Sequence, residues 1–110
     1  MSDLHELHRH ARAIFDYTLT AVYPRPVVST AIGQLDLSSD RIYSIAIGKA
    51  ATSMALGLED ALGDKLSAGV IVSTSLHSSP RWQSFVGGHP LPNEASLAAA
   101  HAAFTLLDRA

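Results

Sequence analysis

The sequence predicts an α/β domain in which a mostly parallel sheet carries helices on both faces. Segments typical of buried strands alternate along the chain with segments of helical periodicity. Strands and helices in alternation form parallel sheets through right-handed crossovers, which place helices on the two faces. Of the 110 residues, 47% are hydrophobic and 16% charged, which is enough apolar content for one buried core. We therefore expect a single domain over residues 1–110.

The first half of the chain predicts two helices and a strand. Apolar residues recur every three or four positions over residues 3–23, which indicates an amphipathic helix. Pro24 and Pro26 are expected to end this helix, and a short second helix is expected over residues 27–35. Residues 41–47 are almost continuously apolar and rich in β-branched side chains, which is typical of a strand buried on both faces.

The second half repeats the alternation. Helical spacing over residues 49–62 follows Gly48, a buried-type strand is expected over 68–74, and a third, shorter strand is expected over 82–86. The residue pattern of the last segment predicts a helix that begins at Asn93.

This last helical pattern continues to Ala110 without a Gly, Asn or Pro stop signal. We therefore expect the chain to be the truncated first domain of a longer protein.

Composition excludes several classes of function. The net charge of −2 gives no basic field for nucleic acid or an anionic membrane. The absence of cysteine excludes disulfides, thiolate metal sites and a cysteine nucleophile. No apolar stretch reaches the length of a membrane span, and the N-terminal residues do not resemble a secretory signal. A cytoplasmic location is therefore expected.

The first candidate site lies where residues 41–47 lead into the next helix. Ligands of open α/β sheets bind beyond the carboxyl ends of the strands, where the free amides at a helix start attract anions. Gly48 allows a close approach, and Lys49, one of two lysines, adds a positive charge. Ala50, Thr52 and Ser53 complete the candidate anion site. On spacing alone, a solvated lysine at a helix start is an equally good interpretation.

The second candidate site is the segment 87–93, which cannot form regular structure. Gly88 brings the backbone near a ligand, His89 can move a proton, Pro90 stiffens the turn, and Asn93 opens the helix. Local reasoning favours a rigid connector at this segment. His77, in the loop after the second strand, is a further candidate for the same crevice. No metal-ligand motif is present among these residues.

These motifs, in this order, resemble the N-terminal part of the bacterial and archaeal glycerate 2-kinases that carry a C-terminal MOFRL domain. The resemblance rests on two motifs about 40 residues apart: Ile45-Ala46-Ile47-Gly48-Lys49-Ala50-Ala51 with Met54-Ala55, and Gly88-His89-Pro90 with Pro92, Glu94 and Ser96. Two departures stand out. Asn93 replaces a frequent Asp, and Leu76 replaces a flexible Gly before His77.

The resemblance implies a Rossmann-like domain of a kinase that moves the γ-phosphoryl group of ATP to D-glycerate with Mg²⁺. It implies a catalytic or substrate-anchoring role for Lys49, and it matches Gly88, His89 and Pro90 to the second motif. The active site of that family is a cleft shared with a C-terminal domain, which would be the missing partner of this chain. The 110 residues alone are therefore expected to be inactive.

Two other functions stay open at this point. A phosphosugar-binding domain of the sugar-isomerase type would use hydroxyl groups to hold phosphate, and Thr52, Ser53 and the run Ser73-Thr74-Ser75 suit that role. A non-catalytic interaction domain would show apolar surface on a helix that lacks its partner. The residues also leave open which glycerate hydroxyl reacts, the preferred nucleotide and whether the protein forms a homo-oligomer.

Overall fold

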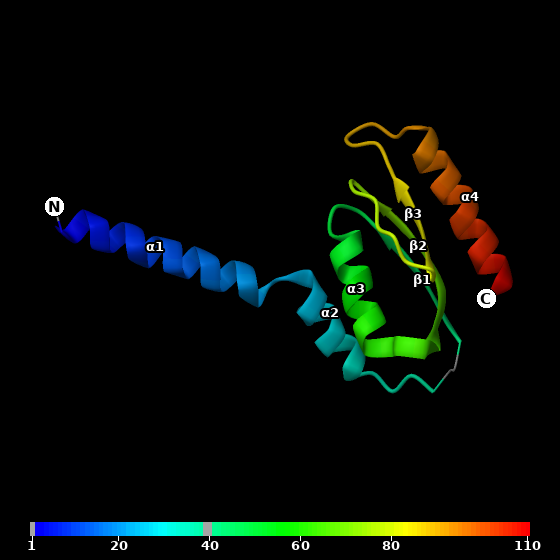
Figure 1. The fold of residues 1–110 in the computed structure, drawn as a ribbon, viewed down its shortest axis with the longest axis horizontal. Coiled ribbons are helices and arrows are strands. Elements are labelled where there is room, and N and C mark those ends of the chain that lie inside the picture. Colours follow the sequence, from blue (N-terminus) through cyan, green and yellow to red (C-terminus); the bar gives the residue numbers. More distant parts are fainter. Residues whose placement is uncertain (1, 39–40) are drawn as a thin grey trace.

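A computed structural model describes residues 2–38 and 41–110. Its elements follow the order α1 (Ser2–Ala21), α2 (Pro24–Gly33), β1 (Ile42–Ile47), α3 (Ala51–Leu62), the 3₁₀ turn η1 (Gly63–Lys65), β2 (Leu66–Ser73), β3 (Trp82–Val86) and α4 (Glu94–Arg109) (Figure 1). The third strand matches its predicted bounds, and Asn93 caps α4 as the sequence predicts.

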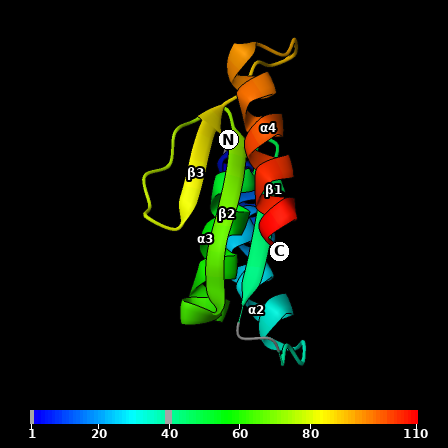
Figure 2. The same ribbon diagram turned by 90° about the vertical axis from the view of Figure 1, so that its right-hand side faces the viewer.

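The three strands form one parallel sheet in the order β1-β2-β3. The central strand β2 pairs with both neighbours, so that Val70 lies opposite Ile45 and Val72 lies opposite Phe85. The two views place α3 on one face of the sheet and α4 on the other (Figures 1 and 2). The predicted α/β class, with a parallel sheet covered on both faces, is therefore confirmed.

The main core lies between α3 and the sheet. Its buried side chains come from α3 and from the two strands β2 and β3: Ala51, Ala55, Leu62, Leu66, Ile71 and Trp82. Alternate residues of β2 face opposite sides of the sheet. Ile71 enters this core, so Val70, which is also buried, lies on the opposite face. This burial on both faces explains why the strand predicted over residues 68–74 is almost continuously apolar.

The two prolines have a second role beyond the predicted one. Helix α1 ends at Ala21, before Pro24, as the sequence predicts, and Pro24 and Pro26 also open α2, three residues before its predicted start. The first turn of a helix needs no N–H donors, and proline already has a helical φ, so it is well suited to this place. Close packing then fixes α2 on α3, because a Cβ at Gly57 would collide with the carbonyl oxygen of Arg25.

Two boundaries around the site also shift. The helix expected from residue 49 begins at Ala51, so Lys49 lies in the turn before it. Gly48 has a φ of 121°, a backbone conformation that residues with a side chain rarely adopt. This conformation turns the chain out of β1. The strand expected from residue 68 begins two residues earlier, at Leu66, because η1 leads directly into it.

The long helix α1 projects away from the sheet and its helices (Figure 1). Its described side chains are all exposed, and the projection gives the chain an elongated form of 63 × 37 × 18 Å. Within residues 2–38 and 41–110, no helix has both the length and the apolar character needed to cross a membrane.

Candidate functional site

A pocket of about 300 Å³ lies where the three strands end. The strands are parallel, so the loops that follow them meet at one edge of the sheet. The ends of β1 and β2, the loop after β3 and one side of α4 all line this pocket. The two candidate segments of the sequence, at Gly48-Lys49 and at Gly87-Gly88-His89, are therefore brought to the same place.

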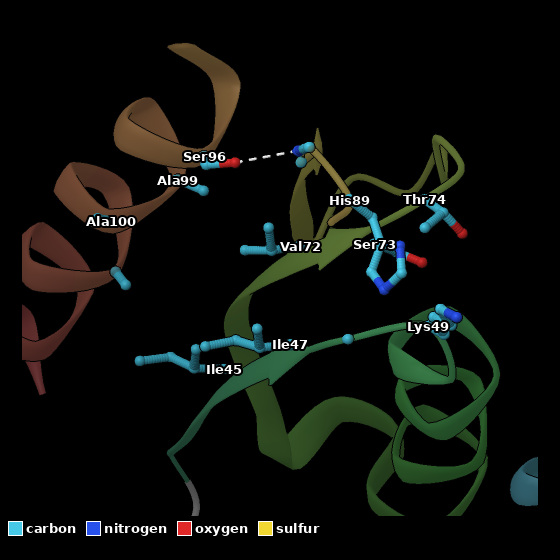
Figure 3. Close-up of a pocket in the computed structure, with 14 residues that line it drawn as sticks. Ile45, Ile47, Lys49, Val72, Ser73, Thr74, His89, Ser96, Ala99 and Ala100 are labelled. Atoms are coloured by element: carbon cyan, nitrogen blue, oxygen red, sulfur yellow. Dashed lines mark hydrogen bonds between the residues drawn. The ribbon is translucent and has the colours of Figure 1, made fainter. Parts of the chain in front are cut away.

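The pocket has an apolar end and a polar end (Figure 3). Ile45 and Ile47 of β1 face Ala99 and Ala100 of α4 at the apolar end. The polar end holds the side chains of Lys49, Ser73, Thr74 and His89. This division suits a small ligand with one charged end.

Backbone bonding at the first motif leaves part of the turn free. The N–H of Gly48 donates to the carbonyl oxygen of Val72 at 2.9 Å, so it cannot serve a ligand. The N–H groups of Lys49 and Ala50 have no backbone acceptor in the described chain. The expectation of free amides at the helix start therefore holds for Lys49 and Ala50 and not for Ala51, whose N–H donates to the carbonyl oxygen of Gly48 at 3.1 Å.

Lys49 is an uncompensated positive charge at the pocket. Its side chain is exposed and makes no ion pair within residues 2–38 and 41–110. No Asp or Glu is among the described residues that line the pocket. An anion placed there would meet attraction from Lys49 and no repulsion from a nearby carboxylate.

The second motif is held by a network at the start of α4. Asn93 Oδ1 accepts the N–H of Ser96 at 2.9 Å, and Ser96 Oγ accepts the N–H groups of Asn93 and Gly88 at 3.2 and 3.1 Å. A Cβ at Gly88 would collide with the carbonyl oxygen of Leu91, so the loop requires glycine there. The network leaves His89 exposed on the pocket wall, before a cis bond to Pro90.

His77 does not reach this pocket. The chain must travel back along the sheet between β2 and β3, because the two strands run in the same direction. At His77 it lies beside the middle of β3, where the His77 N–H donates to Ser84 Oγ at 2.9 Å. The expectation that His77 joins Lys49 at the strand ends therefore does not fit the geometry.

Other predicted residues also lie off the pocket wall, namely Ala50, Thr52, Ser53, Pro90 and Asn93. The hydroxyl groups of Thr52 and Ser53 are buried in the first turn of α3. The Asn93 side chain is engaged in capping α4. These residues shape the surroundings of the site and do not line it.

Ser73 and Thr74 line the pocket and were absent from the predicted glycerate-kinase site. The sequence contained a signal for them, because polar residues that directly follow a buried strand lie at the ligand edge of a parallel sheet. The sequence assigned Ser73 and Thr74 a role only in the sugar-isomerase alternative.

The residues at the pocket do not fit a Mg²⁺ ion. Magnesium in proteins prefers carboxylate oxygens, and the polar side chains here are an ammonium, two hydroxyls and an imidazole. No cluster of three or more His, Asp or Glu suited to a metal occurs in the described part of the chain. The same side chains do fit the oxygens of a carboxylate or phosphate.

Comparisons with known proteins agree with this fold and motif order. The chain is 31% identical, over 99% of its length, to D-glycerate 2-kinase of Thermotoga maritima, of which it spans 26%. It also matches a crystal structure of glycerate kinase from Thermotoga maritima with a TM-score of 0.82 and 30% identity, over 93% of this chain and 25% of that one. The predicted resemblance to the N-terminal part of glycerate 2-kinases is confirmed, and the chain spans about a quarter of this relative. Residues 10–110 match the family described as "Domain of unknown function (DUF4147)", and the chain belongs to that family.

Proposed function

We propose that this chain forms the N-terminal part of a cytoplasmic kinase that transfers the γ-phosphoryl group of ATP to D-glycerate. The observation that carries the proposal is the uncompensated Lys49 at the strand ends, facing the same pocket as His89. The 31% identity to a D-glycerate 2-kinase supports the choice of substrates.

Lys49 would offset the repulsion between the two substrates. Glycerate carries a carboxylate and ATP a polyphosphate, and both must enter one site. A glycerate hydroxyl oxygen forms a bond to the γ-phosphorus as the bond from that phosphorus to the bridging oxygen breaks, releasing ADP. The hydroxyl proton leaves in the same reaction, and His89 is the imidazole on the pocket wall that could accept it.

The pocket alone lacks part of what this reaction needs. No carboxylate on its described wall can hold the magnesium that accompanies ATP, so such ligands would come from a further domain of the parent protein. The 110 residues by themselves are therefore expected to show no turnover.

The test measures ADP release with D-glycerate as the acceptor. It uses a longer polypeptide, called the parent, in which this segment is joined to the rest of a glycerate kinase. Lys49→Ala should lower the rate about 10²–10³-fold, since the loss of one well-placed electrostatic donor has this effect. Lys49→Arg should restore little, because a planar guanidinium does not replace a compact ammonium.

The matched control is Lys65→Ala, at the only other lysine. Lys65 lies in η1, before β2, and its ammonium donates to the carbonyl oxygen of Leu37 at 3.3 Å. This variant should keep the parent rate. Equal rates for Lys49→Ala and the parent would remove Lys49 from the mechanism, and turnover by the 110 residues alone would contradict the shared site.

The sugar-isomerase alternative has weaker support. Of the hydroxyl residues that it needs, Ser73 and Thr74 line the pocket, whereas Thr52, Ser53 and Ser75 do not. It predicts that the protein converts a sugar phosphate without ATP. An isomerase assay on the same preparation tests this directly.

A further inference from the structure

Ser73 carries a buried hydroxyl group without a partner. The residue is the last of β2 and only 4% exposed, and its Oγ makes no hydrogen bond within residues 2–38 and 41–110. Its backbone is fixed, since the carbonyl oxygen of Ser73 accepts the N–H of Gly87 at 3.0 Å. Burying a hydroxyl without a hydrogen bond costs free energy, so the group calls for an explanation.

The position of Ser73 separates it from the other unpartnered groups. Buried polar atoms without partners also occur in Thr52, Ser53, His77 and Trp82. None of those four residues lines the pocket at the strand ends, whereas Ser73 does. Among these orphaned groups, the Ser73 hydroxyl is therefore the one that belongs to a residue of the pocket wall.

The chemistry around Ser73 is that of an oxyanion site. Figure 3 shows Ser73 at the polar end of the pocket, with Lys49 and His89 at the same end. The ammonium of Lys49 supplies charge, and the Ser73 hydroxyl can supply a directed hydrogen bond. A carboxylate or phosphate oxygen accepts both.

We propose that Ser73 is a specificity-determining residue whose hydroxyl donates a hydrogen bond to the anionic group that Lys49 attracts. The naming of glycerate carboxylate or ATP phosphate as that group rests on the proposed function. The oxyanion site itself rests on Lys49, the orphaned hydroxyl and the pocket.

The first experiment measures anion binding to the 110-residue chain. Inorganic phosphate and D-glycerate are titrated separately into isotope-labelled protein, and the amide signals of Gly48, Lys49 and Ser73 are followed by NMR. We expect one of the anions to shift these signals, and its identity distinguishes phosphate from carboxylate. Ser73→Ala should weaken that binding about 10-fold or more, as expected for a hydrogen bond to a charged group.

Two variants make the result specific to the hydroxyl. Ser73→Thr keeps the hydroxyl and should retain most of the affinity. Ser67→Ala removes an exposed hydroxyl at the other end of β2 and should leave the affinity unchanged. Absence of a shift with both anions, or equal affinity for Ser73→Ala and the original chain, would overturn the proposal.

Kinetics of the parent kinase separates this proposal from the proposed function. Ser73→Ala should raise the KM of glycerate alone if the group is a carboxylate, or the KM of ATP alone if it is a phosphate. Unchanged values for both substrates, in a parent whose activity depends on Lys49, would refute the role of Ser73 and leave the kinase function standing. Phosphate binding that requires Ser73, in a parent that does not phosphorylate glycerate, would support the role of Ser73 and refute the kinase function.

Discussion

Helices α1 and α3 have the same kind of sequence pattern and opposite surroundings. Both show apolar residues at three- and four-residue spacing. Helix α3 buries Ala51, Ala55, Gly57 and Leu62 against the sheet and α2. Helix α1 buries none of its described side chains, and its apolar stripe, which includes Ile14 and Phe15, lies open to solvent.

The difference shows what helical periodicity can predict. The pattern identifies a helix and the face that requires cover, but it does not say which element supplies the cover. For α3 the cover comes from this chain, since α2 and the sheet both pack against it. For α1 no described element supplies it, and the helix is held by bonds within itself.

The largest expected effect comes from truncating one isoleucine in each region. Ile71 is fully buried between α3 and the sheet, so Ile71→Ala should lower the free energy of unfolding by about 2–5 kcal/mol. Ile14 on α1 is 67% exposed, so Ile14→Ala should change it by no more than about 0.5 kcal/mol. Urea denaturation followed by the fluorescence of Trp82, the single buried tryptophan, measures both.

Similar losses for the two variants would break the comparison. They would mean that α1 is covered in solution, and a dependence of the Ile14→Ala effect on protein concentration would identify a second copy of the chain as the cover.

The second-largest expected effect on stability concerns the ion pair that joins α2 to α3. Arg25 Nε and Nη2 donate to the two carboxylate oxygens of Asp60 at 2.6 and 2.9 Å. This hydrogen bonding holds the pKa of Asp60 below its ordinary value. A carboxylate with a lowered folded-state pKa stabilises the fold above its unfolded pKa, and this contribution is lost as the pH falls through the folded value.

Arg25→Ala should therefore reduce stability at neutral pH, and its difference from the original chain should disappear in acid, once Asp60 is protonated. Thermal unfolding from pH 7 down to pH 2 measures this. Asp64→Asn provides the control, since its pair with Arg81 does not link the two helices. A difference that persists unchanged at the lowest pH would mean that Arg25 stabilises by packing and not by charge.

The sequence predicted the fold class because the strands are local signals. The almost continuous apolar run at 68–74 predicted β2, and the Asn93 cap predicted the start of α4. Helix α1 ends before Pro24 as predicted, but the start of α2 at Pro24 was missed. A proline that ends one helix also suits the first turn of the next, and the packing of α2 on α3 is known only from the tertiary structure.

The site was predictable where it depends on topology. Parallel strands bring the residues after β1 and β3 to one edge, so Lys49 and His89 could be paired from sequence alone. His77 was misplaced because the path of a connecting loop depends on tertiary structure. The orphaned hydroxyl of Ser73 was beyond prediction, since hydrogen-bond satisfaction is known only once every neighbour is placed.

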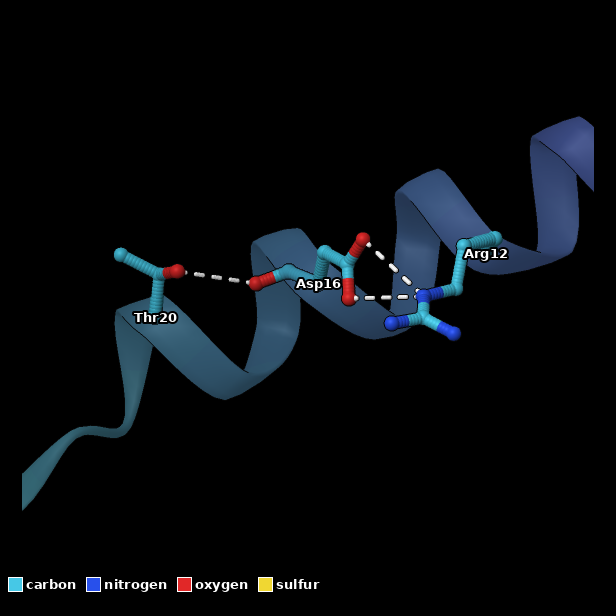
Figure 4. A network of polar contacts seen from close by, with 3 residues as sticks. All are labelled: Arg12, Asp16 and Thr20. Atoms are coloured by element: carbon cyan, nitrogen blue, oxygen red, sulfur yellow. Dashed lines mark hydrogen bonds and ion pairs between the residues drawn. The ribbon is translucent and has the colours of Figure 1, made fainter.

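The smallest expected effect tests the local bonds that hold α1. Arg12 Nε donates to both carboxylate oxygens of Asp16 at 3.1 and 3.2 Å, and Thr20 Oγ1 donates to the carbonyl oxygen of Asp16 at 2.9 Å (Figure 4). The arginine precedes the acid, which is the less favourable order for a pair four residues apart, and both side chains are exposed.

Asp16→Asn should therefore destabilise α1 by about 0.5 kcal/mol or less, and the difference should vanish in high salt, which screens exposed pairs. Amide hydrogen exchange along α1, at low and high salt, measures this. Glu6→Gln is the matched control, because its contact with Arg9 is longer, at 3.5 Å, and should matter less still. A loss that is independent of salt, or that spreads to the amides of β2, would show that Asp16 holds α1 against the rest of the chain, and the contrast between α1 and α3 would then fail.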